Sequence, residues 1–284
     1  MNSPSTDTSP VLPTRGQKPA SRLRWICLGL AIITAASGTW LAQQQLDQPL
    51  TGIDDANIFF TYASNLAGGE GFVYNAGGER VEGFTSLLWT LICAFAFLVH
   101  AEPEALVLGI SSLLLATALS QASLFLAESI TKPGRETRAD WLILSMLLAF
   151  STWALAAPSF MIWTTVTLMD TGLWCVVFTC GTIAFARAAR HADSSWPRDW
   201  PLCAWTVAML LTRPEAMLIV LVWIGSLALV RLFSTRRAKG HLLERLWIHC
   251  RIPLLGYLLT LVGLTLFRLV YFGYPLPNTF YAKV

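Results

Sequence analysis

Long apolar stretches recur along the whole chain, and this pattern restricts its fold more than any other feature. A helix needs about 20 mostly apolar residues to cross a bilayer. Stretches close to that length occur at 25–42, 84–100, 105–127, 139–157, 171–188, 199–212, 214–233 and 252–272. They predict an all-α protein, a polytopic bundle of transmembrane helices whose backbone polar groups are satisfied within each helix.

The composition agrees with a surface that faces lipid. Only 13% of the residues are charged and 55% are hydrophobic, whereas a soluble domain carries about 25% charged residues. The net charge of +3 comes from short basic clusters between apolar stretches. Such clusters are a topology signal, and they do not predict a nucleic-acid partner.

Four basic clusters set the expected topology. They are the N-terminal tail, Lys132/Arg135/Arg138, Arg187/Arg190 and Arg231/Arg236/Arg237/Lys239. The positive-inside rule puts all four in the cytoplasm. An even number of crossings must then separate the first two clusters, so stretches 84–100 and 105–127 together contribute one crossing. This leaves about seven crossings, with the N-terminus inside and the C-terminus outside.

The two ends of the chain differ in composition. Residues 1–23 are rich in Ser, Thr and Pro, so we expect a disordered cytoplasmic tail there. Residues 24–284 form the expected transmembrane module, beginning with a signal anchor at 25–42. The polar residues then gather on four outer pieces, which are the loop 43–83, the turns 158–170 and 212–215, and the tail 273–284.

The outer loop begins with two adjacent acids, Asp54 and Asp55. Residues 54–66 have helical periodicity, which predicts a short interfacial helix with both acids in its first turn. The acids could cap that helix, act as a general base beside lipid, or hold a divalent cation through oxygen ligands, the one cofactor that the sequence suggests. The sequence does not choose between these roles.

A charged turn interrupts the apolar sequence further along. Arg213 and Glu215 flank a proline there, and intramembrane charge is costly. We therefore expect the two to pair with each other, or Arg213 to hold a lipid phosphate by two parallel hydrogen bonds. Asp170 precedes another apolar stretch, where a helix cap and a functional role are equally compatible with its position.

A proline-rich segment ends the chain. Arg268, Asn278 and Lys283 lie around it, and its prolines predict an extended loop that leaves the membrane. Lys283 could neutralise a phosphate or simply mark a solvated end.

Five sequence blocks in order resemble GT-C glycosyltransferases, and most closely the terminal β-(1→2)-arabinofuranosyltransferase group. The blocks are D-D-A-x-I-x-x-x-Y-A-x-N-L at 54–66, G-x-G-x-V-Y-N at 69–75, V-E-G-F-T-S-x-L-W at 81–89, T-R-P-E at 212–215 and Y-F-G-Y-P-L-P-N-T-F-Y-A-K at 271–283. The resemblance implies a GT-C-type membrane module in the inner (plasma) membrane of a bacterium, with its active site on the outer face.

The resemblance also implies an activity. It is inverting transfer of a sugar, arabinofuranose in the best-known relatives, from a polyprenyl-phosphate donor to a glycan or lipid acceptor of the cell envelope. Asp54 or Asp55 would be the base that deprotonates the acceptor hydroxyl. The implied phosphate-binding residues are Arg213, Lys283, Asn278 and Arg268, and the implied supporting residues are Glu82, Asn75, Asp170 and Glu215.

Two departures from the family pattern keep alternatives open. The turn that usually reads G-[LM]-E-T has Met169-Asp170-Thr171 here, with a shorter acid and no glycine. Related proteins continue with further helices and an outer soluble domain, which we expect to be absent from this chain. The alternatives are a catalytically inactive membrane subunit, or half of a split enzyme with a separately encoded C-terminal half. A lipid-linked sugar transporter is less favoured, because no internal repeat is evident.

Overall fold

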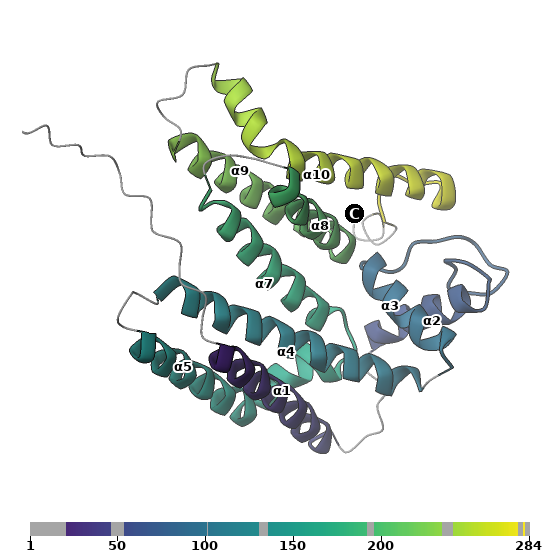
Figure 1. Cartoon of the computed structure of the whole chain (residues 1–284). Coiled ribbons are helices and arrows are strands. Elements are labelled where there is room, and N and C mark those ends of the chain that lie inside the picture. The colour runs from purple at the N-terminus through teal and green to yellow at the C-terminus, as the bar shows by residue number, and fades with distance from the viewer. Residues whose placement is uncertain are drawn as a thin grey trace, which may run out of the picture.

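The computed structural model describes residues 21–46, 54–100, 102–130, 136–191, 196–234, 241–277 and 281, and within them all regular secondary structure is helical (Figure 1). The predicted all-α bundle is thus confirmed. Its elements are α1 (Ser21–Gln44), α2 (Asp54–Ala67), α3 (Leu87–Leu98), α4 (Pro103–Ile130), α5 (Glu136–Ala156), α6 (Pro158–Met161), the π-helix η1 (Ile162–Val166), α7 (Thr171–Ala188), α8 (Trp196–Thr212), α9 (Ala216–Ser234) and α10 (Leu242–Phe272).

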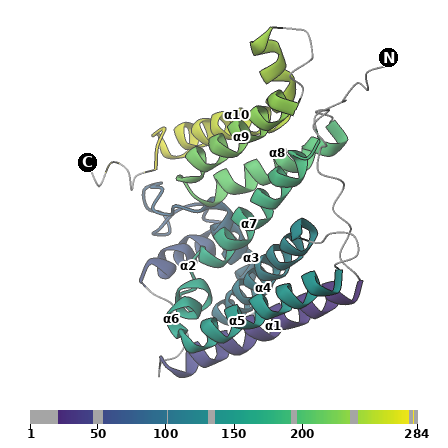
Figure 2. The same cartoon turned by 90° about the vertical axis from the view of Figure 1, so that its left-hand side faces the viewer.

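The helices form two groups joined by α7. Helices α1, α4 and α5 pack together on one side, and α8, α9 and α10 pack together on the other (Figures 1 and 2). Helix α7 contacts both α4 and α8, and the short pair α2–α3 lies beside one end of the bundle. The long helices therefore run side by side, as membrane-spanning helices do.

Contacts between helices fix their relative directions. Helices α4 and α7 are parallel, because Gly172 packs on Ser111 near their starts and Glu128 pairs with Arg187 near their ends. Helices α8 and α10 are also parallel, because Arg231 binds both Asp199 and the His249 carbonyl towards their starts, and Leu211 and Leu264 line one groove towards their ends. These directions place all the described residues of the predicted basic clusters at one end of the bundle, the basic end. The opposite end, which carries the loop between α2 and α3, is called the loop end.

Within the described residues, five helices are long and apolar enough to cross a membrane, namely α1, α4, α7, α9 and α10. Helix α5 and the α6–η1 segment would add a sixth span if the pair counts as one, although the chain bends there by 90° at Pro158. The predicted total of about seven therefore depends on α8, which has 17 residues and a buried acid, Asp199, but lies alongside α7 and α10.

The stretches 84–100 and 105–127, predicted to make one crossing between them, form helices of clearly different length. Helix α3 has only 12 residues, whereas α4 has 28 and meets the criteria for a span. Ser86 accepts a hydrogen bond from the Trp89 N–H and so starts α3 beyond the loop. The pair thus contributes one long helix and one short one, in agreement with the prediction that it makes a single crossing.

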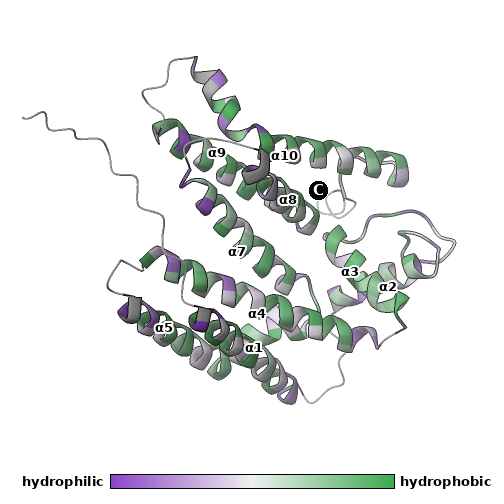
Figure 3. Cartoon of the chain, in the orientation of Figure 1, coloured by the Kyte–Doolittle hydropathy of each residue, from purple (hydrophilic) through white to green (hydrophobic). Residues whose placement is uncertain are grey.

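Exposed tryptophans lie near both ends of the long helices. At the basic end they are Trp25, Trp141, Trp200 and Trp247, and towards the loop end they are Trp40, Trp153 and Trp163. Tryptophan collects at the two bilayer interfaces, and hydrophilic residues gather towards helix ends and loops (Figure 3). The two sets of tryptophans mark where lipid headgroups would meet the bundle.

A buried ion pair holds the basic end together, and sequence patterns did not reveal it. Arg231, which we had placed in a cytoplasmic basic cluster, is fully buried and donates two hydrogen bonds of 2.7 Å to Asp199. It also donates to the carbonyl oxygen of His249 at 2.8 Å. The Arg231 side chain therefore links α8, α9 and α10. Its role is to stabilise helix packing, so its charge is not evidence for the topology.

Candidate functional site

Helix α2 confirms the predicted short helix and begins at Asp54, while its position at the membrane interface stays a prediction. Its apolar face is buried in the main core through Ala56, Phe59 and Tyr62. Asp55 is exposed at the start of the helix, while the side chain of Asp54 lies outside the described residues. An exposed carboxylate at this position is accessible to a ligand, so the roles predicted for the two acids stay predictions.

Side chains of α2 hold the loop that follows this helix. The Asn65 side-chain amide donates to the carbonyl oxygens of Val73 and Tyr74 at 2.8 and 2.9 Å. The Tyr62 hydroxyl donates to the Val81 carbonyl and accepts from the Gly83 N–H, and its burial raises the pKa of Tyr62. These bonds fix the backbone on both sides of the loop tip.

The same loop is attached to the end of α10. The Phe72 N–H donates to the Tyr271 hydroxyl at 2.9 Å, and the Arg80 guanidinium lies 4.6 Å from the centre of the Tyr271 ring. Gly71 has a φ of +85°, and a Cβ there would collide with the Tyr271 hydroxyl. Glycine is therefore required both by the backbone conformation and by the close approach of α10.

Glu82 and Arg268 form the strongest contact between the loop and α10. The Nε and Nη2 atoms of Arg268 donate to the Glu82 carboxylate at 2.8 to 3.1 Å, and both side chains are almost completely buried. Two parallel charge-assisted hydrogen bonds fix the orientation of both groups. Two residues that were predicted separately, one supporting and one phosphate-binding, thus lie in direct contact.

Arg213 pairs with Asp170 and not with Glu215, so the expected mutual pair within 212–215 is wrong. Its Nε and Nη2 atoms donate to the Asp170 carboxylate at 2.9 and 2.7 Å, and these hydrogen bonds raise the pKa of Arg213. Asp170 occupies the N-cap position of α7, but its side chain makes no cap hydrogen bond. A carboxylate that receives two bonds from Arg213 is better satisfied than one that caps a helix.

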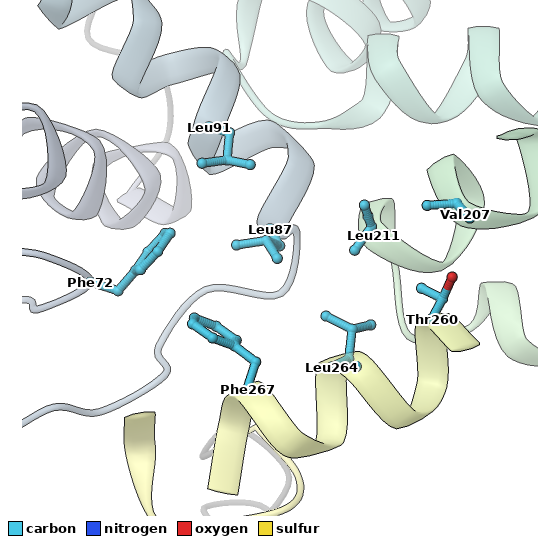
Figure 4. Close-up of a pocket in the computed structure, with 9 residues that line it drawn as sticks. Phe72, Leu87, Leu91, Val207, Leu211, Thr260, Leu264 and Phe267 are labelled. Carbon is cyan, nitrogen blue, oxygen red and sulfur yellow. The ribbon is translucent and has the colours of Figure 1, made fainter. Parts of the chain in front are cut away.

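An apolar groove opens between the loop, α3, α8 and α10 (Figure 4). Its volume is about 510 Å³, and its walls are formed by Phe72, Leu87, Leu91, Val207, Leu211, Thr260, Gly263, Leu264 and Phe267. Gly263 has open space in front of it. Thr260 has the one polar side chain among these lining residues, and its hydroxyl donates to the Gly256 carbonyl at 2.7 Å.

A second cavity of about 370 Å³ adjoins the groove and is called the mixed pocket. The two share Leu87, Leu211 and Leu264 as walls. The mixed pocket is also lined by Thr85, Leu210, Pro214, Glu215, Met217, Arg268, Leu276 and Pro277. Two predicted site residues, Glu215 and Arg268, therefore line the same cavity where the apolar groove reaches the loop end.

The remaining predicted residues have different positions. Asn75 is exposed in the loop, where its carbonyl oxygen accepts from the Gly78 N–H in a turn. Asn278 and Lys283 lie outside the described residues. Among the residues that the structure describes, no group of three or more His, Cys, Asp or Glu side chains is arranged to hold a metal ion. The apolar groove was not predicted, since nothing in a leucine-rich helix distinguishes a groove wall from a lipid-facing surface.

In comparisons with known proteins, no family model, curated protein or solved structure matches the chain.

Proposed function

We propose that this chain is a membrane glycosyltransferase of the GT-C type that takes a sugar from a polyprenyl-phosphate donor. The observation that supports it most is the apolar groove that continues into the mixed pocket. A lipid-linked sugar has the same order of parts, a long hydrocarbon chain followed by an anionic phosphate and a polar ring. The groove accepts the chain, and the mixed pocket accepts the headgroup.

The charged groups of the pocket fit a phosphodiester. Arg268 lines the pocket, and Glu82 occupies its Nε and Nη2 hydrogens, while no described residue accepts from Nη1. Arg213 stands on the same turn as Glu215 but lines neither cavity, and its Nε and Nη2 are used by Asp170. Glu82 fixes the plane of the Arg268 guanidinium, so its Nη1 hydrogens are held ready for an anion in the pocket.

The reaction is a direct displacement at the anomeric carbon. Asp54 or Asp55 removes the proton of an acceptor hydroxyl, and that oxygen forms a bond to the anomeric carbon. The bond from this carbon to the phosphate oxygen breaks, its electron pair leaves with polyprenyl phosphate, and the configuration inverts. Negative charge grows on the leaving phosphate, where Arg268 stabilises it. The acceptor is an envelope glycan or lipid on the outer face of the membrane.

The test is sugar transfer by the purified full chain in proteoliposomes. The donors are polyprenyl phosphates that carry arabinofuranose, ribofuranose or mannose, and the readout is release of polyprenyl phosphate together with the anomeric configuration of the product. The proposal expects turnover with at least one donor and an inverted product. Binding of the donors without turnover, also after addition of a candidate C-terminal half, would instead favour an inactive membrane subunit.

A further inference from the structure

We propose that Glu215 is the residue of the mixed pocket that binds the sugar hydroxyls of the lipid-linked substrate and so determines which sugar is accepted. This inference rests on the proposed function and assigns a specific task to one carboxylate. It starts from the charges of three acids at the loop end, Glu82, Asp170 and Glu215.

Two of these acids are already engaged. Glu82 receives the hydrogen bonds of Arg268, and Asp170 receives those of Arg213. Glu215 differs from them, because it lines the mixed pocket and no described residue donates a hydrogen bond to its carboxylate. It is exposed to the pocket and to solvent, whereas Glu82 and Asp170 are buried.

The position of Glu215 is fixed by its surroundings. It belongs to the tight turn between α8 and α9, in which the Ala216 N–H donates to the Arg213 carbonyl at 3.1 Å and the Met217 N–H donates to the Pro214 carbonyl at 3.2 Å. Proline restricts the backbone of the turn, and the bond from Arg213 to Asp170 ties it to α7. The carboxylate is therefore attached to a rigid part of the pocket wall.

The chemistry of the ligand decides which part of it meets Glu215. A glycosylated lipid phosphate is a phosphodiester, with one negative charge and no hydrogen to donate. An ionised carboxylate is only an acceptor, so it repels that phosphate and attracts hydroxyl groups. The sugar hydroxyls are the donors of such a ligand. The phosphate then lies towards Arg268, and the sugar ring lies towards Glu215.

Glu215 also precedes the first residue of α9, where an acid stabilises the helix N-terminus. A matched control separates this effect from ligand binding. Glu102 is an exposed acid that precedes α4 in the same way and at the same end of the bundle. The Glu102→Ala variant loses the same kind of helix stabilisation but leaves the mixed pocket unchanged.

The experiment measures binding to the full chain in lipid nanodiscs. The probes are decaprenyl phosphate and the three glycosylated decaprenyl phosphates that carry arabinofuranose, ribofuranose or mannose. Glu215→Ala should weaken the best glycosylated probe about 10- to 100-fold, as expected for the loss of hydrogen bonds to a charged group. Its affinity for bare decaprenyl phosphate should stay within about 2-fold or become tighter, since a repulsive charge is gone. Glu102→Ala should bind all four probes like wild type.

Equal weakening of both kinds of probe, or of neither, would overturn the role of Glu215 while leaving the proposed function intact. Failure of wild type to bind any of the four probes would overturn the proposed function and this role with it. Turnover gives a second readout. Glu215→Gln should raise KM with kcat little changed, whereas loss of kcat at unchanged KM would show that Glu215 serves the chemical step and contradict a role in sugar recognition.

Discussion

Arg268 on α10 and Glu82 at the end of the outer loop are 186 residues apart in sequence and form a bidentate ion pair with distances of 2.8 to 3.1 Å. Arg268 also lines the mixed pocket. It joins the loop to the helix whose side chains also form the apolar groove. The arrangement of the pocket therefore depends on a contact between two segments that lie far apart in the sequence.

Removing one partner of this pair should destabilise the loop end. We expect Glu82→Ala to cost about 3 kcal/mol, because the Arg268 charge stays buried without compensation. The double variant Glu82→Leu/Arg268→Leu should cost much less than the sum of the single variants Glu82→Leu and Arg268→Leu. Thermal unfolding in detergent and protease cleavage within residues 68–86 measure the loss of stability in the single and the double variants. Additive costs would show that the two residues act independently.

Filling the apolar groove should block long-chain substrates. Gly263→Phe introduces a ring at a groove wall that has open space in front of it. We expect binding of decaprenyl phosphate to weaken at least about 10-fold, since the ring takes the space in which the chain would make its packing contacts with the groove. Gly225→Phe is the matched control, a helical glycine on α9 that also has open space but does not line the groove. If both variants bind like wild type, the groove does not hold the lipid chain.

The attachment of the loop to Tyr271 gives a separate prediction. Tyr271→Phe removes the acceptor of the Phe72 N–H, and an unsatisfied backbone donor costs about 1 to 2 kcal/mol. Hydrogen exchange at residues 71–74 should therefore become faster. Tyr274→Phe is the control, because Tyr274 is 54% exposed and its hydroxyl should contribute little. Unchanged exchange in Tyr271→Phe would mean that other contacts hold the loop in place.

The two ends of the bundle should lie on opposite sides of the membrane. Glu79 is exposed at the loop end and Arg190 at the basic end. We expect Glu79→Cys to react with an impermeant maleimide in intact spheroplasts, and Arg190→Cys to react only after lysis. The six native cysteines require a wild-type background measurement. The opposite labelling pattern would invert the topology and place the pocket in the cytoplasm.

The sequence predicted the parts of this architecture that depend on local patterns. Apolar length predicted the long helices, and helical periodicity predicted α2 from its first residue, Asp54. The sequence did not predict which residues pair between different helices. Nothing local tells that Arg213 pairs with Asp170 and not with its neighbour Glu215, because that choice depends on how α7 and α8 meet. The groove was equally hidden, since a leucine at its wall has the same sequence signal as a leucine facing lipid.

The most direct test of the central proposal is the transfer rate of Asp54→Asn and Asp55→Asn with the preferred glycosylated donor. Asparagine keeps the shape of the side chain but cannot act as the base. We predict that one of the two variants loses at least about 100-fold in kcat, with donor binding unchanged, and that the other keeps most of its activity. Wild-type kcat in both variants would contradict the account, because neither acid of the outer loop would then take part in the transfer.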